Sequence, residues 1–106
     1  MAAHEARISA SVRSSLLAAL EGVEEGAVAA GLPADTASAF AGQALTGTVM
    51  LMVEQGGSPA LLKDRVASPG GTTITGLAAL EAGGVRGAII RAVCTTGNRT
   101  DEGNNE

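Results

Sequence analysis

Apolar residues recur at steps of three and four along most of this chain, which is the spacing of amphipathic α-helices. In the first segment the recurring positions are Ile8, Val12, Leu16, Ala19, Val23, Ala27 and Ala30. We expect this helix to begin near Ser9 or Ser11, because either hydroxyl can cap a helix N-terminus. It should end at Gly31-Leu32-Pro33, since a glycine followed by a proline is a common helix ending.

A second helix is predicted over residues 35–54, and its 45–53 part is apolar on nearly all sides. A helix of this kind needs neighbours on more than one side. For so short a chain, a second subunit is the natural source of those neighbours. Gly42 and Gly47 each cost about 1 kcal/mol relative to alanine inside a helix, so we expect close helix–helix approach to compensate for them.

Three shorter helices are predicted over about residues 59–67, 73–82 and 85–96, with glycine pairs at the breaks. Ser58 should cap the first of these helices, and Leu61, Leu62 and Val66 should face inward from it. Thr72 or Thr73 should cap the second.

The chain shows no alternation of period two that would predict a strand, so we predict an all-α fold of about five helices. Residues 1–97 should form one helical domain, because 106 residues allow one domain and no more. Residues 98–106 are polar and aperiodic, and we expect them to form a disordered tail.

Composition favours self-association. Hydrophobic residues make up 45% of the chain, but many of them are alanine and Phe40 is the single aromatic residue. Such a core buries little area per residue, and small domains are marginally stable on their own. We therefore predict a homodimer. The residues expected at its interface are Phe40, Leu45, Val49, Met52, Ile74 and Leu77.

The charge balance and the apolar runs argue against several classes of partner. Seven basic and eleven acidic residues give a net charge of −4, and the basic residues are scattered. The chain therefore lacks the basic patch and the aromatic side chains for base stacking that nucleic-acid binding requires. The longest candidate apolar run, residues 49–53, is far shorter than the roughly 18 residues of a membrane span. The N-terminus has no apolar signal-peptide core. We expect neither a nucleic-acid nor a membrane partner.

Cys94 is the single cysteine, so an internal disulfide is impossible and a reducing, cytoplasmic location is the natural interpretation. Cys94 falls within a helical pattern, and we expect a buried structural thiol rather than a nucleophile. No group of His, Cys, Asp and Glu residues has the spacing of metal ligands, so no metal is expected.

The stretch Ser68-Pro69-Gly70-Gly71-Thr72-Thr73 is the candidate binding site. A glycine turn that leads into a helix exposes backbone N–H groups at the positive end of the helix dipole. The N–H groups of residues 71–73 and the hydroxyls of Ser68 and Thr73 could hold a small carboxylate. No Lys or Arg adjoins the glycines, which disfavours phosphate as the ligand. Judged alone, the stretch also fits a capped helix–helix corner that binds nothing.

Residues 61–74, followed by Gly76-Leu77, Leu80-Glu81 and Gly83-Gly84, closely resemble the C-terminal signature of the pyrroline-5-carboxylate reductases. These enzymes make proline by NAD(P)H-dependent reduction of a cyclic imine carboxylate. A looser resemblance reaches back through Gly31-Leu32-Pro33 to the first helix. The chain as a whole is similar to the helical dimerisation domain of the family, without the Rossmann domain that normally precedes it.

The resemblance implies a helical bundle like the C-terminal domain of 6-phosphogluconate dehydrogenase, interlocked as a homodimer or part of a higher oligomer. It implies that Ser68, Gly71, Thr72 and Thr73 contact the carboxylate of a proline-like substrate. No cofactor is expected on this chain alone, and NAD(P)H would bind once a Rossmann domain, supplied by a separate chain, completes the enzyme.

Two functions are therefore expected to compete. In the first, the chain is the dimerisation and substrate-binding half of a reductase and is inactive alone. In the second, it is a non-catalytic helical module that assembles with itself or with full-length reductase subunits.

Overall fold

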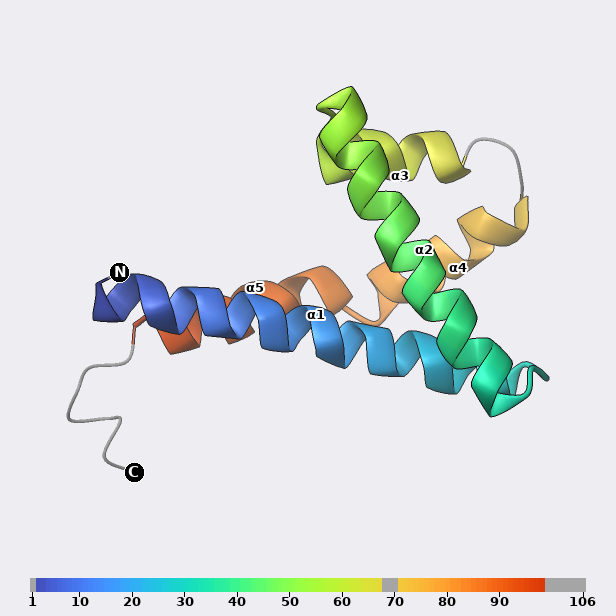
Figure 1. Ribbon diagram of the computed structural model, residues 1–106, viewed down its shortest axis with the longest axis horizontal. Helices are drawn as coiled ribbons and strands as arrows, with labels where there is room; N and C mark the ends of the chain where they lie inside the picture. Colours follow the sequence, from blue (N-terminus) through green and yellow to red (C-terminus); the bar gives the residue numbers. More distant parts are fainter. Residues whose placement is uncertain (1, 68–70, 99–106) are drawn as a thin grey trace. The chain divides into compact units, whose positions relative to one another are not determined.

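The computed structural model describes residues 2–67 and 71–98, without the side chains of residues 65–67 and 72. The described residues form five helices and no strand (Figure 1). The helices are α1 (Ala3–Ala29), α2 (Ala34–Gln55), α3 (Pro59–Ala67), α4 (Gly71–Ala82) and α5 (Val85–Gly97). This confirms the predicted all-α fold. The predicted tail lies outside the described residues from position 99 onward, and the domain boundary at residue 97 stays a prediction.

The start of α1 was predicted wrongly, because the helix begins at Ala3 and not at Ser9 or Ser11. The Ala6 N–H donates to the Ala2 carbonyl at 2.9 Å, so the first turn is already helical. Alanine has the highest helix propensity of all residues, which allows this first turn to form without a serine cap. Both serines lie inside the helix.

Glycines with positive φ follow α1, α2 and α4, at the breaks where the sequence predicted helix ends. Gly31 after α1 has a φ of 120°, and Gly56 after α2 has a φ of 64°. The Gly56 N–H donates to the Met52 carbonyl at 2.9 Å and satisfies one of the last acceptors of α2. At α3 the Leu61 N–H donates to Ser58 Oγ at 3.2 Å, which confirms the predicted cap.

The start of α4 differs from the prediction. The helix begins at Gly71, so Thr72 and Thr73 lie in its first turn and neither residue caps it. The N–H groups of a first helical turn have no acceptor within their own helix. The backbone amides assigned to anion binding therefore belong to the N-terminal turn of α4.

The described residues divide into two compact units, one comprising residues 2–20 and 80–98 and the other residues 21–67 and 71–79. In the first unit, α5 lies along the N-terminal part of α1 (Figure 1). Ser11 Oγ donates to the Ala92 carbonyl at 3.4 Å across this contact. A Cβ added at Gly97 would lie 3.1 Å from Ile8 Cγ1, so glycine allows a close approach of the two helices.

The buried apolar core of the described residues is small and lies in the second unit. It consists of Ala37, Ala41 and Leu62, which are 1%, 3% and 4% exposed. The expectation that Leu61 faces inward beside Leu62 was wrong, because Leu61 is 50% exposed. Neighbouring residues of a helix point about 100° apart, so a narrow contact covers one of the two and leaves the other bare.

Most large apolar side chains of the described residues are exposed in the single chain. They are Val12, Leu16, Leu17, Val23, Val28, Phe40, Leu45, Val49, Met50, Val53, Leu61, Ile74, Leu80, Ile89 and Ile90. Extended apolar surface of this kind marks sites where a protein contacts another molecule.

Cys94 is exposed, so the expectation of a buried thiol was wrong. The side of α5 that carries the Ala92 carbonyl contacts α1. Residues two positions apart on a helix point about 200° apart, which turns Cys94 away from that contact.

α2 has the length and composition of a membrane-spanning helix. It has 22 residues, and its most apolar 18-residue stretch has a mean hydropathy of 1.3 and is 11% buried. The prediction that no apolar stretch of the chain is long enough to span a membrane was therefore wrong. Isolated Ser, Gln and Thr residues interrupt the run without lowering the mean hydropathy far. The core helix of a soluble protein passes the same test, so the absence of a membrane partner stays a prediction.

Replacing Gly56 and Gly57 separately with alanine tests the helix ending at α2. Gly56→Ala should lower the free energy of unfolding by about 1–2 kcal/mol, because a side chain disfavours the left-handed conformation. Gly57 has no positive φ, and a Cβ there meets Leu62 at an ordinary 3.6 Å. Gly57→Ala should therefore be neutral or stabilising by up to about 1 kcal/mol. Chemical denaturation followed by circular dichroism measures both, and equal losses would contradict the assignment.

Candidate functional site

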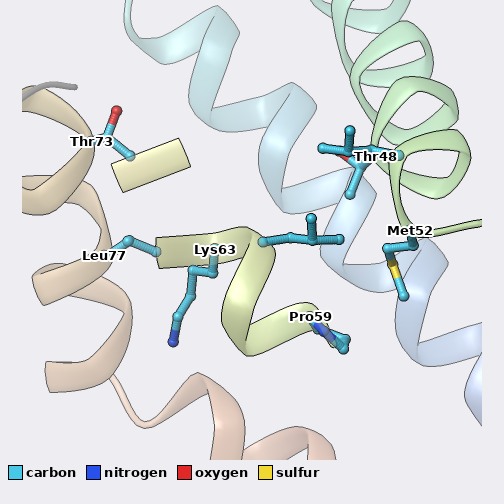
Figure 2. A pocket seen from close by; sticks show the side chains of 8 residues that line it. Thr48, Met52, Pro59, Lys63, Thr73 and Leu77 are labelled. Atoms are coloured by element: carbon cyan, nitrogen blue, oxygen red, sulfur yellow. The ribbon is translucent and has the colours of Figure 1, made fainter. Parts of the chain in front are cut away.

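A cavity of about 240 Å³ lies in the second unit, where α2, α3 and α4 meet. Its lining residues are Thr48, Leu51, Met52, Pro59, Leu62, Lys63, Thr73 and Leu77. Figure 2 shows the α2 side chains at one side, the α4 side chains at the other, and α3 between them. Most of the wall is apolar, with a few polar groups, which is the usual composition of a small-molecule pocket.

The polar side chains on the wall come from three helices: Thr48 from α2, Lys63 from α3 and Thr73 from α4. Lys63 is exposed, so its ammonium group stays in water while its methylene stem covers part of the apolar wall. Thr73 is partly buried. The cavity therefore offers hydrocarbon contact and two hydroxyl groups, and the Lys63 ammonium group lies in the water outside it.

Thr73 connects the cavity with the N-terminal turn of α4. Its side chain lines the cavity, and its residue lies in the first turn of the helix. The N-terminus of a helix attracts anions through its free N–H groups and through the helix dipole. A small molecule at Thr73 could place an anionic group at this turn and an apolar group against Leu77.

The structure locates the predicted substrate-binding residues only in part. Gly71 and Thr72 open α4, but the side chain of Thr72 lies outside the description, and Ser68 lies outside the described residues altogether. Thr73 is the member of the set whose side chain can be placed, and it adjoins the cavity.

The predicted interface residues fall into two groups. Phe40, Leu45, Val49 and Ile74 are exposed and free to meet another molecule. Met52 and Leu77 are partly buried and line the cavity of their own chain.

Sequence reasoning assigned no role to Thr48 or Lys63, although both line the cavity. For Lys63 a signal was available, since Pro59, Leu62 and Lys63 follow each other at steps of three and one and share one side of α3. The sequence does not reveal which helices this side meets. Among the residues that the structure describes, no three His, Cys, Asp or Glu side chains gather as metal ligands would.

A model of the pyrroline-5-carboxylate reductase dimerisation family matches residues 4–103. Pyrroline-5-carboxylate reductase from Glycine max is 45% identical over 84 residues, which cover 79% of this chain and 31% of the relative. The enzyme of the same name from Synechocystis is 47% identical over 83 residues, or 78% of this chain and 31% of the relative. The one from Arabidopsis thaliana is 39% identical over 95 residues, or 90% and 34%. No solved structure is a significant match.

The five helices and the matched range define an all-α dimerisation domain. The chain belongs to the pyrroline-5-carboxylate reductase dimerisation family, as the resemblance at residues 61–84 suggested. It spans about a third of the length of the relatives it matches.

Two substitutions at Leu62 test whether the cavity wall belongs to the folded core. Leu62 is 4% exposed, so Leu62→Ala should lower the free energy of unfolding by about 2–5 kcal/mol. Leu62→Met keeps the volume and should cost less than about 1.5 kcal/mol. Urea denaturation of both variants measures the difference. A loss below about 1 kcal/mol for the alanine variant would show that this wall is not packed.

Proposed function

We propose that this chain forms the dimerisation and substrate-binding part of a pyrroline-5-carboxylate reductase, which catalyses the last step of proline synthesis. The family match over residues 4–103 supports the assignment to this class of enzyme. The observation that carries the binding role is the position of Thr73, at the first turn of α4 and on the wall of the cavity.

The substrate carboxylate binds the N-terminal turn of α4 in this proposal. The N–H groups of Gly71, Thr72 and Thr73 lie at the positive end of the helix dipole and need an acceptor from outside the helix. Hydrogen bonds to a charged carboxylate contribute about 1.5–3 kcal/mol each. The Thr73 hydroxyl and the Ser68 hydroxyl supply two further donors.

The non-polar part of the substrate ring contacts the apolar wall beside Thr73. Leu77 lies one turn further along α4, and Lys63 lines the same cavity from α3. The Lys63 ammonium group adds a positive charge near the cavity and favours an anionic ligand. This combination suits a small cyclic carboxylate better than a neutral hydrocarbon.

Catalysis needs a second component that delivers hydride. NAD(P)H held by a Rossmann domain would supply it, and these 106 residues do not include that domain. The role of this chain is to hold the substrate in one orientation, which raises the rate by proximity. The chain without such a domain should be catalytically inactive. Its proposed location is the cytoplasm.

Self-association is the second component of the proposal. Exposed apolar side chains such as Phe40, Val49 and Ile74 form surface that a second copy would cover. The same observation supports the alternative function, a non-catalytic dimerisation module that needs the apolar surface but not the start of α4. The two functions differ in whether the chain binds a carboxylate.

Thr73→Ala tests carboxylate binding. Proline is added to isotope-labelled protein, and the dissociation constant is read from amide chemical shifts at the start of α4. Loss of one hydrogen bond to a charged group should weaken binding about 10- to 100-fold. Thr95→Ala is the matched control, because Thr95 is an exposed residue of α5 in the other unit and should leave the dissociation constant unchanged. No shift at millimolar proline with the unaltered chain would favour the non-catalytic module.

Val49→Asp tests self-association separately. Val49 is 48% exposed in the single chain, so aspartate is tolerated by the monomer but would be buried in a dimer without a partner charge. The variant should sediment as a folded monomer at concentrations where the unaltered chain and Thr73→Ala are dimers. A monomeric unaltered chain would refute the proposed homodimer.

A further inference from the structure

Thr48 is a polar residue on the wall of the cavity to which the proposed function gives no task. Leu51 and Met52 lie beside it on the same wall, because residues three and four positions apart share one side of a helix. Figure 2 shows Thr48 and Met52 on one side of the cavity and Thr73 on the other. The cavity therefore has one hydroxyl-bearing residue on α4 and a second one across from it on α2.

Thr48 belongs to the side of α2 that packs within its own chain. It follows the buried Ala41 by seven residues, which at about 100° per residue turns it only about 20° away from that direction. Its side chain is nevertheless exposed, whereas Leu51 and Met52 are partly buried. Thr48 therefore faces the inner side of the second unit, where the cavity leaves it accessible.

The hydroxyl of Thr48 is available to a bound molecule. Within residues 2–67 and 71–98, no hydrogen bond occupies it. The hydroxyls of Thr46 and Thr96, in contrast, donate to carbonyls four residues earlier, at 2.9 and 3.0 Å. Packing does not require the Thr48 hydroxyl either, because valine has the same branched shape without it.

The cavity has room for a ring that carries a substituent. An apolar cavity of about 150 Å³ already holds a benzene ring. The cavity beside Thr48 has a volume of about 240 Å³. When the carboxylate lies at the N-terminal turn of α4, the far side of the ring points toward α2. An unsubstituted ring meets Leu51 and Met52 there, whereas a polar substituent could reach the Thr48 hydroxyl.

The α2 wall restricts the chemistry of such a substituent. The stretch between Asp35 and Glu54 contains no charged residue, so α2 offers no counter-charge to a second ionised group on the ligand. The Lys63 ammonium group lies in the water outside the cavity. A hydroxyl group is neutral, and it can donate to the threonine hydroxyl or accept from it. The substituent that matches Thr48 is therefore a hydroxyl group.

We propose that Thr48 is a specificity-determining residue, whose hydroxyl forms a hydrogen bond with a hydroxyl group on the side of the ring opposite the carboxylate. The preferred ligands are then small ring carboxylates that carry a hydroxyl group. This inference rests on the proposed function and names the substrate class of the same site. Unsubstituted ring carboxylates bind too, but less tightly, because the Thr48 hydroxyl then keeps its hydrogen bonds to water.

The two epimers of 4-hydroxyproline test the inference, with proline as the reference. Dissociation constants are read from amide chemical shifts of the isotope-labelled chain. The hydroxyl group projects from opposite faces of the ring in the two epimers, so one epimer alone can meet Thr48 while its carboxylate is held at α4. That epimer should bind about three- to tenfold more tightly than proline, which is the usual gain from one neutral hydrogen bond.

Substitutions at Thr48 assign the preference to its hydroxyl. Thr48→Val should abolish the preference and leave the dissociation constant of proline unchanged within about twofold. Thr48→Ser keeps a hydroxyl group and should retain the preference. Thr46→Val is the matched control, because the Thr46 hydroxyl donates to the Gly42 carbonyl and lies outside the cavity wall. Circular dichroism checks that each variant is folded.

The outcomes separate this inference from the proposed function. Equal dissociation constants for proline and both epimers would overturn the inference and leave carboxylate binding in place. A preference that survives Thr48→Val would refute the role of Thr48. So would a loss of proline binding in folded Thr48→Val, because Thr48 would then hold the whole ring and not its substituent. If none of the three acids binds at millimolar concentration, the proposed binding role fails, and this inference fails with it.

Discussion

The central constraint on this protein is that its single chain buries very little of its apolar surface. Among the described residues, the buried apolar side chains are two alanines and Leu62, while residues as large as Phe40 and Val53 remain exposed. Burial of apolar area is the main favourable term in folding, and small domains obtain little of it alone. The fold is therefore best understood as one part of an assembly, and the family to which it belongs carries dimerisation in its name.

Small residues let the helices approach each other closely. Ile8 adjoins Gly97 where α1 meets α5, and Ser11 bonds to a carbonyl of α5 across the same contact. Within α2, by contrast, Gly42 and Gly47 face open space in the single chain. The glycine between α1 and α5 therefore has a close contact within the chain, whereas the two glycines of α2 have none.

The candidate binding site combines two features that belong to different parts of the sequence. The N-terminal turn of α4 offers backbone amides, and the cavity between α2, α3 and α4 offers an apolar wall. Thr73 takes part in both. A site assembled in this way would depend on the fold of the second unit, because α2 and α3 supply most of the wall, whereas the amides depend on α4 alone.

The sequence by itself determined the helical class, the number of helices and the helix endings at Gly31 and Gly56, because these follow from spacing and from glycine's freedom at positive φ. The family signature was likewise legible in it. Only the tertiary structure decided which residues are covered: Leu62 and not Leu61 is buried, and Cys94 is exposed. The physical reason is that helical periodicity defines faces, whereas burial depends on which helices those faces meet, and such contacts join residues far apart in the sequence.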